Sequence, residues 1–223
     1  MNFKGFEEKG IQFLKNLAVN NNKEWFEQNR DVYEKYLLVP MRQLVTDLQL
    51  LLKSVDAEIE TTPAINKTIS KIYRDTRFSA DKLPFRTEQW MSFKRPMKIW
   101  GNVPEFYFYF TPEKYGYGMG FYSATPQNME KIRESITSYP DRFKRIIDAY
   151  NTQNVFILGG ENYKRPFPNS LPEEFQEWFR KKSLYLGCEK EIDKAFYSIQ
   201  LKDILEKAFA DNSTLYRFLI ESI

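Results

Sequence analysis

The sequence contains no histidine and only one cysteine, Cys188. Catalytic systems in which an imidazole activates a serine or a cysteine are therefore excluded, as are zinc sites that depend on histidine. A single thiol also excludes tetrathiolate zinc and iron–sulfur sites. Because no histidine base can activate it, Cys188 is expected to be an inert thiol in a C-terminal loop. We expect no cofactor and no metal ion.

Long apolar runs are missing as well. No stretch approaches 18 consecutive apolar residues, so a membrane-spanning helix is not expected, and the first residues show no apolar signal segment. A lone cysteine also fits a reducing compartment, because a disulfide framework needs pairs. These absences predict a cytoplasmic protein without a membrane partner.

What the chain does contain is typical of a globular protein. Of its 223 residues, 42% are hydrophobic and 28% are charged, whereas the aromatic fraction of 17% is high. A chain of this length can bury a substantial core without disulfides. Since we find neither an internal repeat nor a low-complexity linker, we predict a single domain over residues 1–223.

Helical periodicity dominates both ends of the chain. Asn21, with Glu24 three residues later, resembles a capping box that starts the second helix, and Pro40 is expected to separate that helix from a third. The predicted helices cover residues 6–20, 23–38, 40 to about 60, 126–137 and 139–151, a segment that opens at Pro172, and two or three more helices up to Ile223.

The middle of the chain alternates with a period of two instead. Residues 68–74 and 105–110 are predicted strands, and residues 155–158 form a short strand or a hairpin edge. In residues 115–122 the alternation places three glycines on one face, which either admits a ligand or lets a helix pack closely. The fold class predicted is α+β, with an antiparallel sheet in the middle of the chain packed by N-terminal and C-terminal helices.

Positive charge is concentrated in one part of the chain. The net charge is only +3, yet residues 61–100 carry nine basic and three acidic side chains, which leaves +6 in that window. The flanking regions are close to neutral or slightly acidic. This asymmetry indicates a local electrostatic feature rather than a general polycation.

The window contains the segment KIYRDTRFSADKLPFR, residues 71–86. It resembles the motif of a mainly bacterial, uncharacterised family called domain of unknown function 2461, Arg-x-x-Arg-Asp-x-Arg-Phe-x-x-x-Lys-x-Pro-Tyr-Lys. The identical positions are Arg74, Asp75, Arg77, Phe78, Lys82 and Pro84, whereas Lys71, Phe85 and Arg86 are similar replacements. Further similar stretches begin at Asn20, Gly120, Lys164 and Lys182. The resemblance implies a bacterial, cytoplasmic α+β protein without an assigned activity.

The basic motif has a functional and a structural interpretation. Guanidinium and ammonium groups bind phosphate or carboxylate, so we predict a site for a small anionic ligand. Its residues are Arg74, Asp75, Arg77, Lys82 and Arg86. The alternative is that Asp75 and Asp81 pair with the arginines and hold the turn together. A magnesium site on these two acids is disfavoured, because four cations surround them.

A second basic set could complete the same pocket or belong to a solvated loop. It consists of Lys164, Arg165 and Lys182. Two other functions compete with ligand binding. The basic and aromatic window of residues 67–98 suits nucleic acid, and exposed aromatic side chains suit a protein-interaction module. The sequence leaves open the ligand, any enzymatic activity and the oligomeric state.

Overall fold

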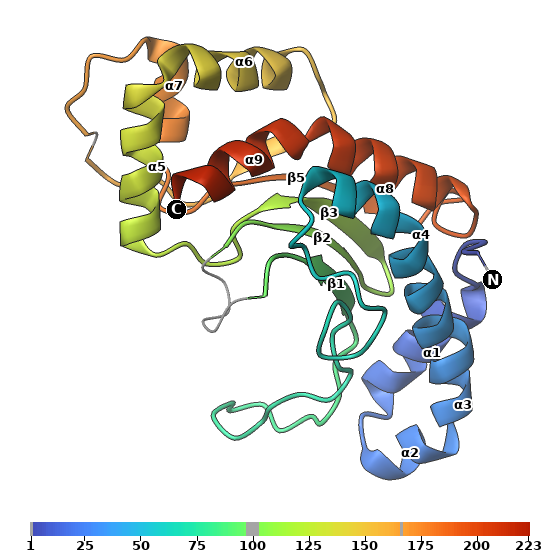
Figure 1. Ribbon diagram of the computed structural model, residues 1–223. Coiled ribbons are helices and arrows are strands. Elements are labelled where there is room, and N and C mark those ends of the chain that lie inside the picture. Colours follow the sequence, from blue (N-terminus) through green and yellow to red (C-terminus); the bar gives the residue numbers. More distant parts are fainter. Residues whose placement is uncertain (1, 97–102, 166) are drawn as a thin grey trace.

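The computed structural model describes residues 2–96, 103–165 and 167–223. Helices lie at both ends of the chain and strands lie mainly between them (Figure 1). The helices are α1 (Glu8–Val19), α2 (Lys23–Gln28), α3 (Arg30–Tyr33), the π-helical turn η1 (Glu34–Leu38), α4 (Val39–Val55), α5 (Pro126–Ser138), α6 (Pro140–Asn151), α7 (Glu173–Phe179), α8 (Gln200–Asp211) and α9 (Ser213–Ser222). The predicted α+β class is confirmed.

Within the described residues, five strands form one antiparallel sheet in the order β1-β2-β3-β5-β4. Their bounds are β1 (Gln89–Phe93), β2 (Glu105–Phe110), β3 (Lys114–Gly120), β4 (Ile157–Gly159) and β5 (Tyr185–Glu191). The predicted strand over 105–110 is confirmed, and the segment near 155–158 provides an edge strand.

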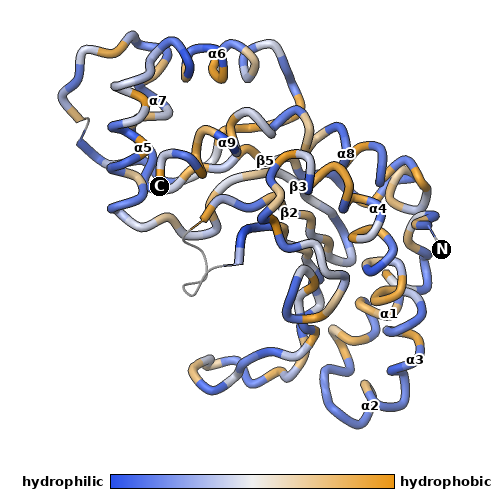
Figure 2. Tube along the Cα trace, viewed as in Figure 1, coloured by the Kyte–Doolittle hydropathy of each residue, from blue (hydrophilic) through white to orange (hydrophobic). Residues whose placement is uncertain are grey.

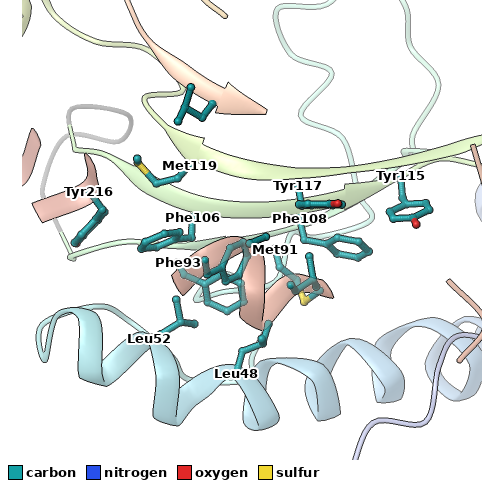
Figure 3. Packing of buried hydrophobic residues seen from close by; sticks show 14 of the residues in the cluster. Leu48, Leu52, Met91, Phe93, Phe106, Phe108, Tyr115, Tyr117, Met119 and Tyr216 are labelled. Atoms are coloured by element: carbon teal, nitrogen blue, oxygen red, sulfur yellow. The ribbon is translucent and has the colours of Figure 1, made fainter. Parts of the chain in front are cut away.

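The core lies between one face of this sheet and the helices α4, α8 and α9 (Figure 1). Alternate side chains of the strands meet α4 and α9 in Figure 3, where they pack in one layer. The labelled members are Leu48, Leu52, Met91, Phe93, Phe106, Phe108, Tyr115, Tyr117, Met119 and Tyr216. Figure 2 shows the same division along the chain, because hydrophobic residues gather on the strands and on the inward sides of these helices. Fully burying one such side chain contributes roughly 1.5–3 kcal/mol.

Three local predictions for the N-terminal helices meet different outcomes. The helix over 6–20 is confirmed as α1. The N-cap of α2 is Asn22 rather than Asn21, because Asn22 accepts a hydrogen bond from the backbone N–H of Trp25 at 2.9 Å. Pro40 lies in the first turn of α4, as predicted. The predicted separation from the preceding helix is wrong, because the backbone stays helical from η1 into α4.

Two predictions in the sheet region are wrong. Residues 68–74 form no regular strand. They meet their neighbours at isolated bridges, from Ile69 to Ile65 and to Met91 and from Tyr73 to Phe85. The segment turns away from β1 after a few hydrogen bonds, so its alternation never becomes a continuous ladder. The region around Cys188 is strand β5 rather than loop or helix. Pairing with β3 imposes this strand on a segment whose own pattern is weak.

Candidate functional site

The basic motif forms a hairpin that projects from the body of the protein (Figure 1). Its two arms are joined by backbone hydrogen bonds, from Arg74 N to the Pro84 carbonyl and from Arg86 N to the Ile72 carbonyl, both at 2.8 Å. We call residues 72–86 the basic hairpin.

Asn21 anchors the base of the basic hairpin to the N-terminal helices. Its side-chain amide donates to the Phe85 carbonyl and accepts from the Phe85 N–H, each at 3.0 Å. The Phe85 ring is buried and stacks on Phe26 with 4.3 Å between ring centroids. The ring therefore acts as a hydrophobic anchor, for which it needs no hydroxyl.

The charged side chains near the tip of the hairpin are paired with one another. Arg77 donates two hydrogen bonds to Asp75, at 2.9 and 2.6 Å, and Arg74 pairs with Asp81. The side-chain hydrogen bond from Arg77, with a backbone one, lowers the pKa of Asp75 from 3.8 to about 2. Lys82 donates to the backbone carbonyl of residue 76 at 2.9 Å. These contacts are the arrangement that the structural interpretation of the motif predicts.

Arg86 is placed differently from the other members of the motif. Its guanidinium carbon lies 4.6 Å from the centroid of the Trp90 ring, a cation–π geometry. Its Nε atom is buried and has no hydrogen-bond acceptor among the described residues, and no acidic side chain of this part forms an ion pair with it. Arg86 therefore retains unused donor capacity in a position with restricted access to solvent.

Arg86 lines a cleft of about 670 Å³ on the face of the sheet opposite α4 and α8. Side chains alternate between the two faces along β1 and β2. One set is buried in the core, and the other set points to this face. The lining residues are Arg86, Glu88, Trp90, Ser92, Glu105, Tyr107, Tyr109, Thr111, Lys114, Phe121, Tyr122 and Tyr185. We call this hollow the sheet cleft.

The glycine face of β3 explains the floor of the sheet cleft. A Cβ atom on Gly116 would lie 2.5 Å from the Tyr109 ring, and one on Gly118 would lie 2.7 Å from the Tyr107 hydroxyl and 2.1 Å from the carbonyl of Leu186. The bare glycines thus let two tyrosine rings lie across the neighbouring strand. The helices pack on the other face, so the helix-packing alternative does not describe this surface.

Hydrogen bonds fix the tyrosine end of the cleft. The Tyr109 hydroxyl donates to the carboxylate of Glu189, which also accepts from Lys114 at 2.9 Å. Burial raises the pKa of Tyr107, and burial together with the bond to Glu189 raises that of Tyr109. Both hydroxyls therefore keep their protons at neutral pH and remain donors.

The second basic set lies apart from the basic hairpin. Residues 160–165 and 167–171 run beside α5 and α7, at the far end of the molecule from the hairpin (Figure 1). Here Lys164 and Arg165 are exposed, and Lys182 pairs with Glu161 at 2.9 Å. The structure therefore brings the hairpin residues together but does not join these three to them. Pro166 of the similar stretch, and residues 97 and 98 of the basic window, lie outside the described residues.

Several residues of the sheet cleft escaped the sequence predictions, notably Ser92, Glu105, Tyr107 and Tyr109. One signal was available, because strict alternation over residues 105–110 places Glu105 and both tyrosines on one face. The sequence does not say which face the helices cover. In the described part of the chain no group of three acidic or cysteine side chains is arranged to hold a metal ion.

Comparison with known families agrees with the resemblance. The chain matches the family described as "Conserved hypothetical protein (DUF2461)" over residues 9–218 and belongs to that family. No curated protein matches the chain. Among the described residues, no helix has the length and apolar character that crossing a membrane requires.

Proposed function

We propose that this protein binds a small organic anion, phosphorylated or carboxylated, in the sheet cleft. The observation that carries the proposal is the buried Nε of Arg86, which has no acceptor among the described residues. A buried donor without a partner costs free energy, and a bound acceptor removes that cost. Phosphate and carboxylate are the acceptors that a guanidinium group binds most strongly.

The shape and lining of the cleft support a small molecule. Its volume of about 670 Å³ lies within the range of roughly 300–1,000 Å³ that is common for ligand pockets. Half of the lining side chains are aromatic and the other half are polar or charged, so the cleft offers both flat apolar surfaces and hydrogen-bonding groups. Any catalysis here would depend on carboxylate, tyrosine and cationic groups, since the chain has no histidine.

In this proposal the rest of the basic hairpin has a structural role. Arg74 and Arg77 pair with Asp81 and Asp75, so their charges are used within the hairpin. Of the residues in the motif, only Arg86 is therefore proposed to bind the anion. The hairpin holds its backbone in place through the hydrogen bond from Arg86 N to the Ile72 carbonyl.

A thermal-shift screen tests the proposal with nucleotides, sugar phosphates and dicarboxylates on the wild type, Arg86→Gln and the matched control Arg77→Gln. A ligand at 100 times its Kd adds about 2.7 kcal/mol, which raises Tm by roughly 5–10 °C for this chain length. We expect the shift in the wild type and in Arg77→Gln, and its loss in Arg86→Gln. A flat screen, or a shift lost only in Arg77→Gln, would contradict a site at Arg86.

One observation favours nucleic acid as a second candidate. Phe78, at the tip of the basic hairpin, is 93% exposed, and the Arg77 guanidinium lies 5.6 Å from its ring centroid. Exposed aromatic rings beside cations bind single-stranded nucleic acid by stacking. Fluorescence anisotropy with a single-stranded oligonucleotide at low and high salt should then show strongly salt-dependent binding that Phe78→Ala weakens. Equal binding by the variant would exclude this role for the tip.

A further inference from the structure

A buried polar group lies in the sheet cleft, at a different position from Arg86. Glu105 is only 6% exposed and forms an ion pair with Lys94, whose Nζ is 2.9 Å from Oε2. The Ser92 hydroxyl donates to the same oxygen. Both Ser92 and Glu105 line the cleft. A carboxylate and a hydroxyl thus lie on the wall of the cleft, and the carboxylate is paired with an ammonium group.

The ion pair with Lys94 and the hydrogen bond from Ser92 both go to the same oxygen of Glu105, Oε2. A carboxylate offers lone pairs on both oxygens, so Oε1 can accept a further hydrogen bond. Transferring an ion pair into the protein costs desolvation free energy that its own attraction often fails to offset. The arrangement is therefore poorly explained as a device for stability, and groups of this kind are frequent at functional sites.

Lys94 determines what Oε1 can accept. Since the ammonium group already balances the carboxylate charge, a cationic ligand gains little there, whereas a neutral hydroxyl donor suits the remaining lone pairs. A hydroxyl bound in this way adds one more hydrogen bond to the carboxylate.

The spacing along the strands relates this acceptor to Arg86. Arg86 stacks on Trp90, which pairs with Tyr109 across the sheet, and Glu105 lies four residues from Tyr109 along β2. At about 3.3 Å per residue the two positions are about 13 Å apart along the strand. The Tyr107 ring lies between them on the same face. This span is too long for a single inorganic ion and suits a small molecule that has an anionic end, a flat middle and hydroxyl groups.

We propose that the sheet cleft binds a phosphorylated sugar, either free or as part of a nucleotide, and that Glu105 accepts a hydrogen bond from a sugar hydroxyl. The inference rests on the proposed function, because Arg86 holds the phosphate. Trp90 and the cleft tyrosines provide aromatic faces for the sugar ring or the base.

Calorimetric titrations of the wild type test the inference without any substitution. The probes are ribose 5-phosphate, 2-deoxyribose 5-phosphate, adenosine 5′-monophosphate and inorganic phosphate. We expect ribose 5-phosphate or the nucleotide to bind at least about tenfold more tightly than inorganic phosphate. We also expect 2-deoxyribose 5-phosphate, which lacks one hydroxyl, to bind more weakly than ribose 5-phosphate. If ribose 5-phosphate binds more tightly than adenosine 5′-monophosphate, the ligand is a free sugar phosphate. If the nucleotide binds more tightly, the ligand is a nucleotide.

Two variants then separate the roles of the two positions. Glu105→Gln should weaken binding of the sugar phosphate by about tenfold and leave inorganic phosphate unaffected, whereas Arg86→Gln should weaken both. Ser92→Ala, which keeps the Glu105 pair, serves as the second variant if Glu105→Gln does not fold, and should weaken the sugar phosphate less. Dicarboxylates that bind at Arg86 while no sugar phosphate binds would overturn this inference and leave the proposed function intact. Absence of binding by every anion would overturn both.

Discussion

The basic hairpin and the sheet cleft both place an arginine over an aromatic ring, yet the two arginines differ in what surrounds them. Arg77 lies over Phe78 in solvent and gives two hydrogen bonds to Asp75. Arg86 lies over Trp90 in the cleft wall and has a buried Nε without an acceptor in the described part of the chain. The charge of a residue in a basic motif therefore does not by itself identify a site. The two arginines differ in whether that charge is paired in the folded protein.

The surroundings also determine how strongly each arginine interacts with a negative charge. An exposed ion pair contributes about 0–1 kcal/mol, because water screens it and because ordering two long side chains costs entropy. A guanidinium in a partly desolvated aromatic cleft interacts more strongly with an anion, since the effective dielectric constant is lower. The same residue type is thus structural in the hairpin and suited to binding in the cleft.

The largest expected effect on the free energy of unfolding comes from a substitution in the floor of the cleft, compared with one at the exposed tip of the hairpin. Gly118→Val places side-chain atoms against the Leu186 carbonyl and the Tyr107 ring, so the strands must move apart. We expect it to lower the free energy of unfolding by at least about 3 kcal/mol. Phe78→Ala, at an exposed position, should change it by less than about 0.5 kcal/mol. Urea denaturation measures both, and similar values for the two variants would contradict the comparison.

An intermediate effect concerns the ion pairs that hold the hairpin. Asp81→Asn removes the charge that pairs with Arg74 but keeps an oxygen that can accept from the Leu83 N–H. The free energy of unfolding should hardly change, whereas chymotrypsin should cleave after Phe78 faster because the hairpin opens more often.

Its matched control is Asp81→Ala, which removes both contacts and should be cleaved faster still. Unchanged cleavage in both variants would mean that the ion pair does not order the hairpin.

The local parts of the fold were predictable from the sequence. Helices such as α1 and α5, and strand β2, have a periodicity that their own residues display. Strand β5 was missed because its neighbour β3, about seventy residues away, imposes it. The Asp56 carboxylate, which accepts from Arg95 and from Tyr216, 160 residues later, was equally invisible.

The candidate site was predictable only in part. The basic motif contains Arg86, but its separation from Arg74 and Arg77 depends on where the hairpin ends and β1 begins. Alternation over 105–110 placed Glu105 and Tyr107 on one face, yet only the packing of α4 and α8 on the opposite face makes that surface a cleft. Pairing partners and the covered face of a sheet are long-range properties.

The smallest effect on global stability tests the hairpin pairing most directly. The pKa of Asp75 is about 2 in the folded protein against an ordinary value of 3.8, because Arg77 favours the carboxylate. A lowered pKa means that the pair orders the hairpin above about pH 4 and that this contribution disappears as the pH falls towards 2. Since Asp75 and Arg77 are both exposed, the unfolding transition itself should hardly change.

Carbon NMR of the Asp75 carboxyl group, titrated with acid, measures this pKa. The midpoint should lie near 2 in the wild type and return towards 3.8 in Arg77→Gln, and concentrated salt should move the wild-type value in the same direction. Arg86→Gln is the matched control, because Arg86 has no part in this pair, and it should leave the midpoint unchanged. A wild-type midpoint near 3.8 would mean that Arg77 is unpaired in solution, and the hairpin would then present free positive charge as the cleft does.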